Sequence, residues 1–172
     1  MTSSAASLPF AALSLDAASA LCGMSRRTLW RRLAAGELRR LADDVRGRAM
    51  VAWDDVASVF VVPRVRQELA LVLAADGGDA SAQVALGLLC QQAGQGKAAL
   101  YWFGLAAAQD DADAMQWLGR CYLAGEGGTV DMDQGLYWIA KAATRGHAVA
   151  RAQLRGVLAA DPEPPPPGAN AG

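Results

Sequence analysis

Four arginines stand close together, at positions 26, 27, 31 and 32, with no acidic residue among them. Guanidinium groups pair with phosphate oxygens and can form two hydrogen bonds to the O6 and N7 atoms of guanine. On a helix, at 100° per residue, Arg27 and Arg31 lie on the side opposite Leu29 and Leu33. The pattern therefore predicts a helix with one buried apolar face and one cationic face that contacts nucleic acid.

The alternative for this face is an ordinary solvated surface, but such surfaces normally mix both signs of charge. The first 66 residues hold ten arginines against six acidic residues, whereas the rest of the chain holds six basic residues against eleven acidic ones. The formal net charge of the whole chain is only −1. The uneven distribution favours a nucleic-acid partner for the first half.

Residues that could do catalysis or bind a metal are scarce. The chain has one histidine, His147, and three cysteines, Cys22, Cys90 and Cys121, without a Cys-x-x-Cys pair. Neighbouring acidic residues such as Asp110 and Asp111 stand near turns or helix starts, where capping explains them. We therefore expect no catalytic residue, no metal site, no disulfide and no cofactor, and we do not expect an enzyme.

Two helices are predicted to position the arginines. Apolar residues repeat at helical spacing from Leu13 to Cys22, and Ser14 is a candidate N-cap. A turn containing Gly23 follows, Ser25 is a second candidate cap, and a helix over 26–35 stops at Gly36. Two short helices joined in this way are a helix-turn-helix candidate.

A hairpin is predicted next, from strand-like runs at 38–42 and 49–53 with an Arg46-Gly47-Arg48 tip. We expect Asp54 or Asp55 to cap a third short helix that runs to Phe60, with a strand as the alternative. Trp30 and Trp53 are expected to pack between the hairpin and the second helix rather than to touch a ligand.

This order of elements over about residues 13–61 resembles the winged helix-turn-helix of the excisionase and MerR-type family. The resemblance implies that the second helix enters the major groove and that the hairpin, as the wing, contacts the backbone or the minor groove. The chain lacks the long coiled-coil helix by which MerR-type proteins dimerise. The resemblance assigns Arg27, Thr28, Arg31 and Arg32 to the groove and Arg46 and Arg48 to the wing. With Ser25, Arg26 and Arg39 beside them, these are the residues expected to bind DNA.

The second half of the chain repeats itself. Ala-x-Ala starts recur at 80, 112 and 148, and Leu100-Tyr101-Trp102 matches Leu136-Tyr137-Trp138. The repeats predict helices over about 80–92, 97–109, 112–123, 133–144 and 148–159, preceded by a lone helix over 64–76. Small residues let paired helices approach closely, while larger ones fill the space between pairs.

These repeats resemble Sel-one-like repeats, relatives of the tetratricopeptide family, over about residues 77–158. The resemblance implies a protein-binding scaffold without chemistry of its own. An aromatic set on the repeats is a candidate partner-binding stripe, although a role in the core between helices is the better explanation for most of its members. The candidate residues are Tyr101, Trp117, Tyr122 and Tyr137.

The predicted protein is mainly α, with a small winged helix-turn-helix carrying a two-stranded wing, followed by a short α-solenoid. The expected parts are a disordered leader at 1–12, the winged domain at 13–62, the solenoid at 63–160 and a proline-rich disordered tail at 161–172. The tail is given no function, although a partner's aromatic groove could bind it. Two full helix pairs are marginal for a free solenoid, so we expect it to lean on the winged domain or on a second copy.

The expected function is that of a cytoplasmic bacterial transcriptional regulator that binds double-stranded DNA through the winged domain. The repeats would bind a protein partner or form a homodimer. No membrane-crossing segment or secretory signal is predicted. The alternatives are an adaptor or anti-regulator that acts through protein contacts alone, and a phage-type accessory factor that bends DNA.

Overall fold

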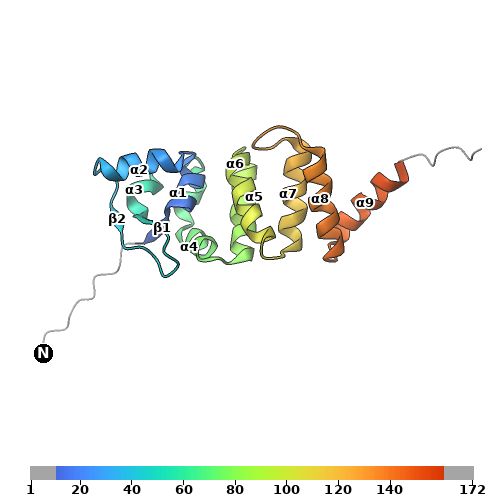
Figure 1. Ribbon diagram of the computed structural model, residues 1–172, viewed down its shortest axis with the longest axis horizontal. Coiled ribbons are helices and arrows are strands. Elements are labelled where there is room, and N and C mark those ends of the chain that lie inside the picture. Colours follow the sequence, from blue (N-terminus) through green and yellow to red (C-terminus); the bar gives the residue numbers. More distant parts are fainter. Residues whose placement is uncertain (1–10, 161–172) are drawn as a thin grey trace, which may run out of the picture.

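The computed structural model describes residues 11–160, with side chains up to residue 157. The chain is mainly helical, as predicted, with a small antiparallel sheet near its N-terminus (Figure 1). The N-terminal elements form one end of an elongated molecule and the last helix forms the other. The predicted disordered tail, and the leader up to residue 10, lie outside the described residues.

The first two helices lie where the sequence predicts them. In α1 (Leu15–Cys22) the Ser14 side chain accepts a hydrogen bond from the Ala17 backbone, and in α2 (Arg26–Ala34) Ser25 does the same for Thr28. Between them Gly23 adopts a left-handed conformation with φ of 63°, which glycine tolerates without steric cost. The turn between α1 and α2 is therefore determined by local residues, namely the two serine caps and the glycine.

The sheet has three strands rather than the predicted two. Strand β3 (Met50–Ala52) lies between β1 (Ala12–Ser14) and β2 (Arg40–Leu41), with antiparallel pairing on both sides. A hairpin of two strands is marginally stable alone and leaves backbone groups unpaired at its edges. β1 satisfies one edge of β3, and the Ala11 carbonyl accepts a hydrogen bond from the Trp53 backbone. The prediction that the chain is a loose leader up to residue 12 is therefore wrong at residues 11 and 12.

Helix α3 (Trp53–Ala57) follows β3 directly and is shorter than predicted. Ala52 occupies its N-cap without a side-chain hydrogen bond, so neither Asp54 nor Asp55 caps it, contrary to the prediction. Both carboxylates stand in the first turn, where the helix dipole favours negative charge. The segment is helical, which settles the alternative of a strand.

The remaining elements form antiparallel helix pairs standing side by side (Figure 1). The predicted lone helix at 64–76 is instead a 3₁₀ helix, η1 (Pro63–Gln67), and a separate helix α4 (Leu69–Gly77), because Glu68 between them leaves helical geometry. The other predicted helices are present within a few residues of their expected ends. They are α5 (Ala80–Gln92), α6 (Gly96–Ala107), α7 (Ala112–Ala124), α8 (Met132–Thr144) and α9 (Ala148–Ala160).

Glycine allows α7 and α8 to approach closely, as the sequence predicts. A Cβ atom on Gly119 would lie 2.9 Å from the backbone oxygen of Gly135 and 2.9 Å from Ile139. We expect Gly119→Ala to lower the free energy of unfolding by about 1–3 kcal/mol, because the two helices must separate. Urea denaturation followed by circular dichroism measures this; Gly104→Ala is the control, since a Cβ there meets nothing within 4 Å.

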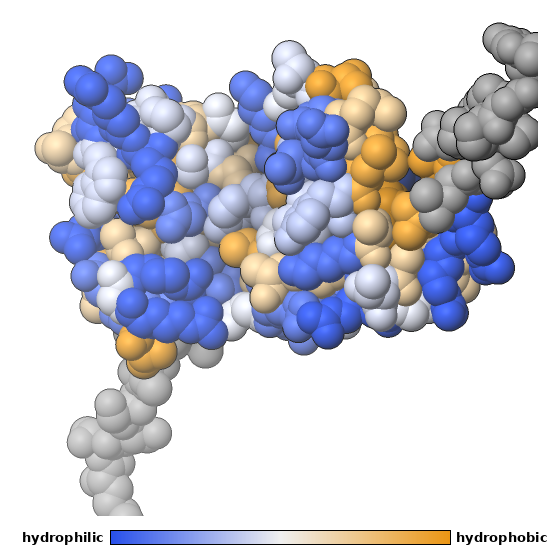
Figure 2. All heavy atoms as spheres, turned by 45° about the vertical axis from the view of Figure 1, so that its right-hand side comes forward, coloured by the Kyte–Doolittle hydropathy of each residue, from blue (hydrophilic) through white to orange (hydrophobic). Residues whose placement is uncertain are grey.

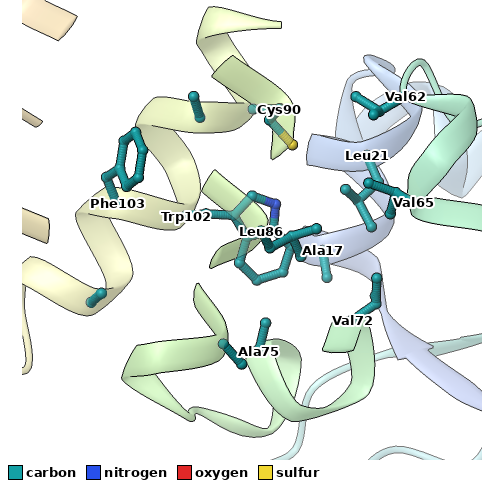
Figure 3. Packing of buried hydrophobic residues seen from close by; sticks show 14 of the residues in the cluster. Ala17, Leu21, Val62, Val65, Val72, Ala75, Leu86, Cys90, Trp102 and Phe103 are labelled. Atoms are coloured by element: carbon teal, nitrogen blue, oxygen red, sulfur yellow. The ribbon is translucent and has the colours of Figure 1, made fainter. Parts of the chain in front are cut away.

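One hydrophobic core runs through the described residues (Figure 3). Ala17 and Leu21 of α1 face Val65 of η1, Val72 of α4, and Trp102 of α6. The core is therefore continuous across residues 62–66, where the sequence predicts a domain boundary, since Val62 and Val65 are buried. The repeats lean on the N-terminal elements, which is one of the two supports that the sequence predicts.

Candidate functional site

The cationic face of α2 is exposed at its centre. Arg27 and Arg31 are exposed, and neither forms an ion pair or side-chain hydrogen bond within the described part of the chain. Leu29 is fully buried on the opposite side and Leu33 is half-buried. The predicted two-faced helix is therefore present.

The flanking arginines of α2 have partners. Arg26 Nε lies 3.1 Å from Asp16, and Arg32 Nε lies 3.4 Å from Glu37. Exposed pairs of this kind contribute little stability and are screened by salt. They leave both side chains able to exchange a carboxylate for a phosphate. Thr28 is half-buried, and its hydroxyl lies 2.9 Å from that of Ser25, at the cap of the helix.

The two tryptophans behave differently from each other. Trp53 is buried and meets Phe60 edge-on, with ring centroids 5.1 Å apart. Trp30 is 40% exposed at the hollow between α2 and the hairpin, where the Arg40 guanidinium lies 5.4 Å from its ring centre. The prediction that Trp30 packs away between hairpin and helix is therefore wrong in part.

Arg39, at the start of the hairpin, is held by Asp55 of α3. Its Nη2 lies 2.7 Å from Asp55 Oδ1, and its Nε lies 3.0 Å from Oδ2. The hydrogen bond from the Arg39 side chain lowers the pKa of Asp55 below its usual value. This two-point contact fastens β2 to α3, and it explains the carboxylate that sequence reasoning assigned to capping.

The arginines of the hairpin tip turn towards α4. Arg46 Nη2 donates to the Gly77 carbonyl at 2.8 Å, and Arg48 lies 2.7 Å from both Asp44 and Asp76. The backbone N–H of Arg48 donates to Asp44 and lowers the pKa of that carboxyl. In this arrangement both arginines that were predicted to contact DNA from the wing contact other residues of the chain.

Asp76 is the residue that sequence reasoning missed. Its side chain is 5% exposed, and it accepts hydrogen bonds from the backbone and the hydroxyl of Ser14 as well as from Arg48. It thereby joins β1, the hairpin and α4 at one point. A single acid in the otherwise apolar helix Leu69–Gly77 was the available signal, because buried carboxylates are nearly always paired.

His147 has a local role. Its Nδ1 accepts a hydrogen bond from the Ala150 backbone at 3.1 Å, at the start of α9, and its Nε2 lies 3.2 Å from Asp113. Within residues 11–160 no three histidine, cysteine or acidic side chains are grouped as metal ligands.

The candidate aromatic stripe divides between core and surface. Tyr101, Trp117 and Tyr122 pack partly buried against the core, and burial raises the pKa of Tyr101 to about 12. Tyr137 is 55% exposed, with its neighbour Trp138 edge-on at 5.1 Å. Of the four candidates, Tyr137 is the most exposed.

The three cysteines are buried and free. Burial raises the pKa of Cys22 to about 11 and those of Cys90 and Cys121 to about 12. Since the thiolate is the reactive form, we expect no labelling of the native protein by a thiol reagent at pH 8 within minutes, and complete labelling in denaturant. Mass spectrometry distinguishes the outcomes, and rapid labelling of the native protein would contradict the packing of these residues.

A family model described as the Sel1 repeat matches residues 80–111 and 112–147. The chain therefore contains Sel1 repeats in the region where the sequence predicts Sel-one-like repeats, and such repeats suggest protein–protein interaction. The matched region covers α5 to α8 and ends before α9. No curated protein matches the chain. No helix within the described residues is long and apolar enough to cross a membrane.

Proposed function

We propose that this protein is a transcriptional regulator that binds DNA through α2 and a protein partner through its Sel1 repeats. The observation that carries the DNA part is the pair Arg27 and Arg31, exposed and unpaired among the described residues on a helix without an acidic residue. In Figure 2 hydrophilic residues dominate the end of the molecule where α2 lies.

The surroundings of α2 support this role. Two helices joined by a tight turn, with a hairpin beside them, give the geometry in which a recognition helix enters the major groove. Arg26 and Arg32 flank the free pair, and Ser25 with Thr28 sits at the helix start, where backbone N–H groups favour an anion. Arg39, Arg46 and Arg48 instead contact other residues of the chain, namely Asp55, Gly77 and Asp76.

A single short helix with two free arginines is a weak module, so two copies on adjacent half-sites are expected to bind together. The Sel1 repeats supply the surface for a protein partner, with Tyr137 as its accessible aromatic residue. The acidic balance of this half keeps it away from the phosphate backbone.

The test is selection of bound fragments from a genomic DNA library, followed by fluorescence anisotropy on the recovered duplexes. The proposal predicts saturable binding that weakens as salt increases. If the anisotropy of every duplex stays constant as protein is added at low salt, the proposal that the protein binds DNA is wrong.

An adaptor that acts only through protein contacts is the second candidate. The observation that favours it is the hairpin tip, whose two arginines both contact α4, Arg46 through the Gly77 carbonyl and Arg48 through Asp76. It predicts one stoichiometric protein in affinity purification together with flat anisotropy.

A further inference from the structure

An open apolar groove lies at the far end of the repeats, where α7, α8 and α9 meet. It has a volume of about 400 Å³. Figure 2 shows a band of hydrophobic residues on this end of the molecule. The residues that line it are Leu123, Leu136, Ile139, Gln153, Leu154, Gly156 and Val157.

The groove is open because bulky side chains of the preceding interface are missing here. Between α6 and α7, Phe103 and Trp117 stack with ring centroids 6.2 Å apart, and Arg120 lies 4.6 Å over Trp117. Aligning α9 with α7, and α8 with α6, places Ile139, Gln153 and Gly156 at these three positions. Smaller side chains leave apolar surface without contacts, which close-packed interiors avoid.

The preceding interface is also covered by the segment that follows its last helix. After α7 the chain crosses the start of α6, where Gly127 packs on Gly96 and Glu126 accepts a hydrogen bond from Gln91 at 2.8 Å. In the next interface the segment in register begins at Asp161. In the alignment of the two interfaces, Leu123 stands at the position of Gln91 and Pro162 at the position of Glu126. A hydrogen-bonded polar pair in the first interface is therefore replaced by two apolar residues in the second.

We propose that the C-terminal segment 161–172 docks in this groove, with its proline rings in the place of the missing aromatic rings. Five of its residues are proline. An extended proline-rich chain advances about 3.1 Å per residue, and the groove residue Val157 lies within one turn of the end of α9. A few residues therefore reach it, and the covalent link gives the segment a high effective concentration there.

The crossing differs in one respect from that of the preceding repeat. Met132 stands where Gly96 allows close backbone approach, and its side chain is 57% exposed. The segment crosses α8 over this side chain and covers it. Docking then caps the open end of the solenoid, which helical repeats require.

The test compares hydrogen exchange of the full chain with that of a chain ending at Ala160. We expect the amides of α8 and α9 to exchange several-fold faster in the shortened protein, and a synthetic peptide of residues 161–172 to restore the slower rate. A full chain with its five prolines replaced by serine will behave like the shortened one. Identical exchange with and without the segment would overturn the proposal.

A groove-filling variant provides the control. In Gln153→Trp the new ring occupies the groove against Ile139, so removal of the segment is expected to leave exchange unchanged. If removal still accelerates exchange in that variant, the segment acts elsewhere and the proposal is wrong. Hydrogen exchange of α8 and α9 is also measured at several protein concentrations, with the oligomeric state of each sample determined by sedimentation. If the amides are protected only where dimers form, a second copy occupies the groove and the proposal is wrong.

Discussion

Asp76→Ala is expected to lower the free energy of unfolding by about 3 kcal/mol. The substitution leaves the Arg48 guanidinium and the Ser14 backbone N–H without their acceptor at a nearly buried point. This value is at the lower end of the range for breaking a buried ion pair. The reason is that the Arg48 side chain is 29% exposed and still has its ion pair with Asp44. Urea denaturation measured by circular dichroism gives the value.

Asp133→Ala is the matched control for that substitution. Asp133 is an exposed acid in the first turn of α8, so its loss is expected to cost about 0.5 kcal/mol or less. Asp76→Asn, which keeps an acceptor for Ser14 but loses the charge opposite Arg48, is expected to fall between the two. If Asp76→Ala were no more destabilising than Asp133→Ala, the hairpin would not be fastened to α4 as described.

Arg27→Ala combined with Arg31→Ala is expected to weaken DNA binding by at least tenfold. Each well-placed arginine contributes about 1–3 kcal/mol when it reads a base, and about 1.4 kcal/mol corresponds to a factor of ten in affinity. Both side chains are exposed, so the free energy of unfolding will change by no more than about 0.5 kcal/mol. Anisotropy titration of a selected duplex measures the affinity.

Arg151→Ala combined with Arg155→Ala removes the same charge from the exposed surface of α9 and is the control for that pair. It is expected to leave affinity within about twofold of the unmodified protein. Helix α9 lies at the opposite end of the molecule from α2 (Figure 1), and charges separated by more than the screening length, about 8 Å at physiological salt, interact weakly. Equal losses for the two double variants would show that net charge alone, rather than the face of α2, governs binding.

The helices were predictable because their signals are local. Ser14 and Ser25 cap the helices that follow them, and each cap acts within three residues. The Ala-x-Ala starts and the close glycines of the repeats recur at nearly fixed spacing, so one helix pair predicts the next. The face of α2 followed from helical rotation alone.

The third strand and the fate of the hairpin arginines could not be predicted in this way. Ala12–Ser14 is too short to show alternation, and it pairs with residues that lie far along the chain. Asp76 meets Ser14 across a separation of 62 residues, which no local pattern records. The hairpin tip is held by residues at the C-terminal end of α4. The position of that end is set by the packing of the core, which a local sequence pattern does not reveal.

The salt dependence of DNA binding tests the central claim most directly. For the unmodified protein, the logarithm of the association constant is expected to fall linearly with the logarithm of salt concentration, at about 0.9 for each phosphate neutralised. Replacing Arg27 and Arg31 by alanine is predicted to make that slope shallower by about 1–2, while the Arg151 and Arg155 pair leaves it unchanged. An unchanged slope in the Arg27 and Arg31 variant would contradict a role for α2 in holding DNA.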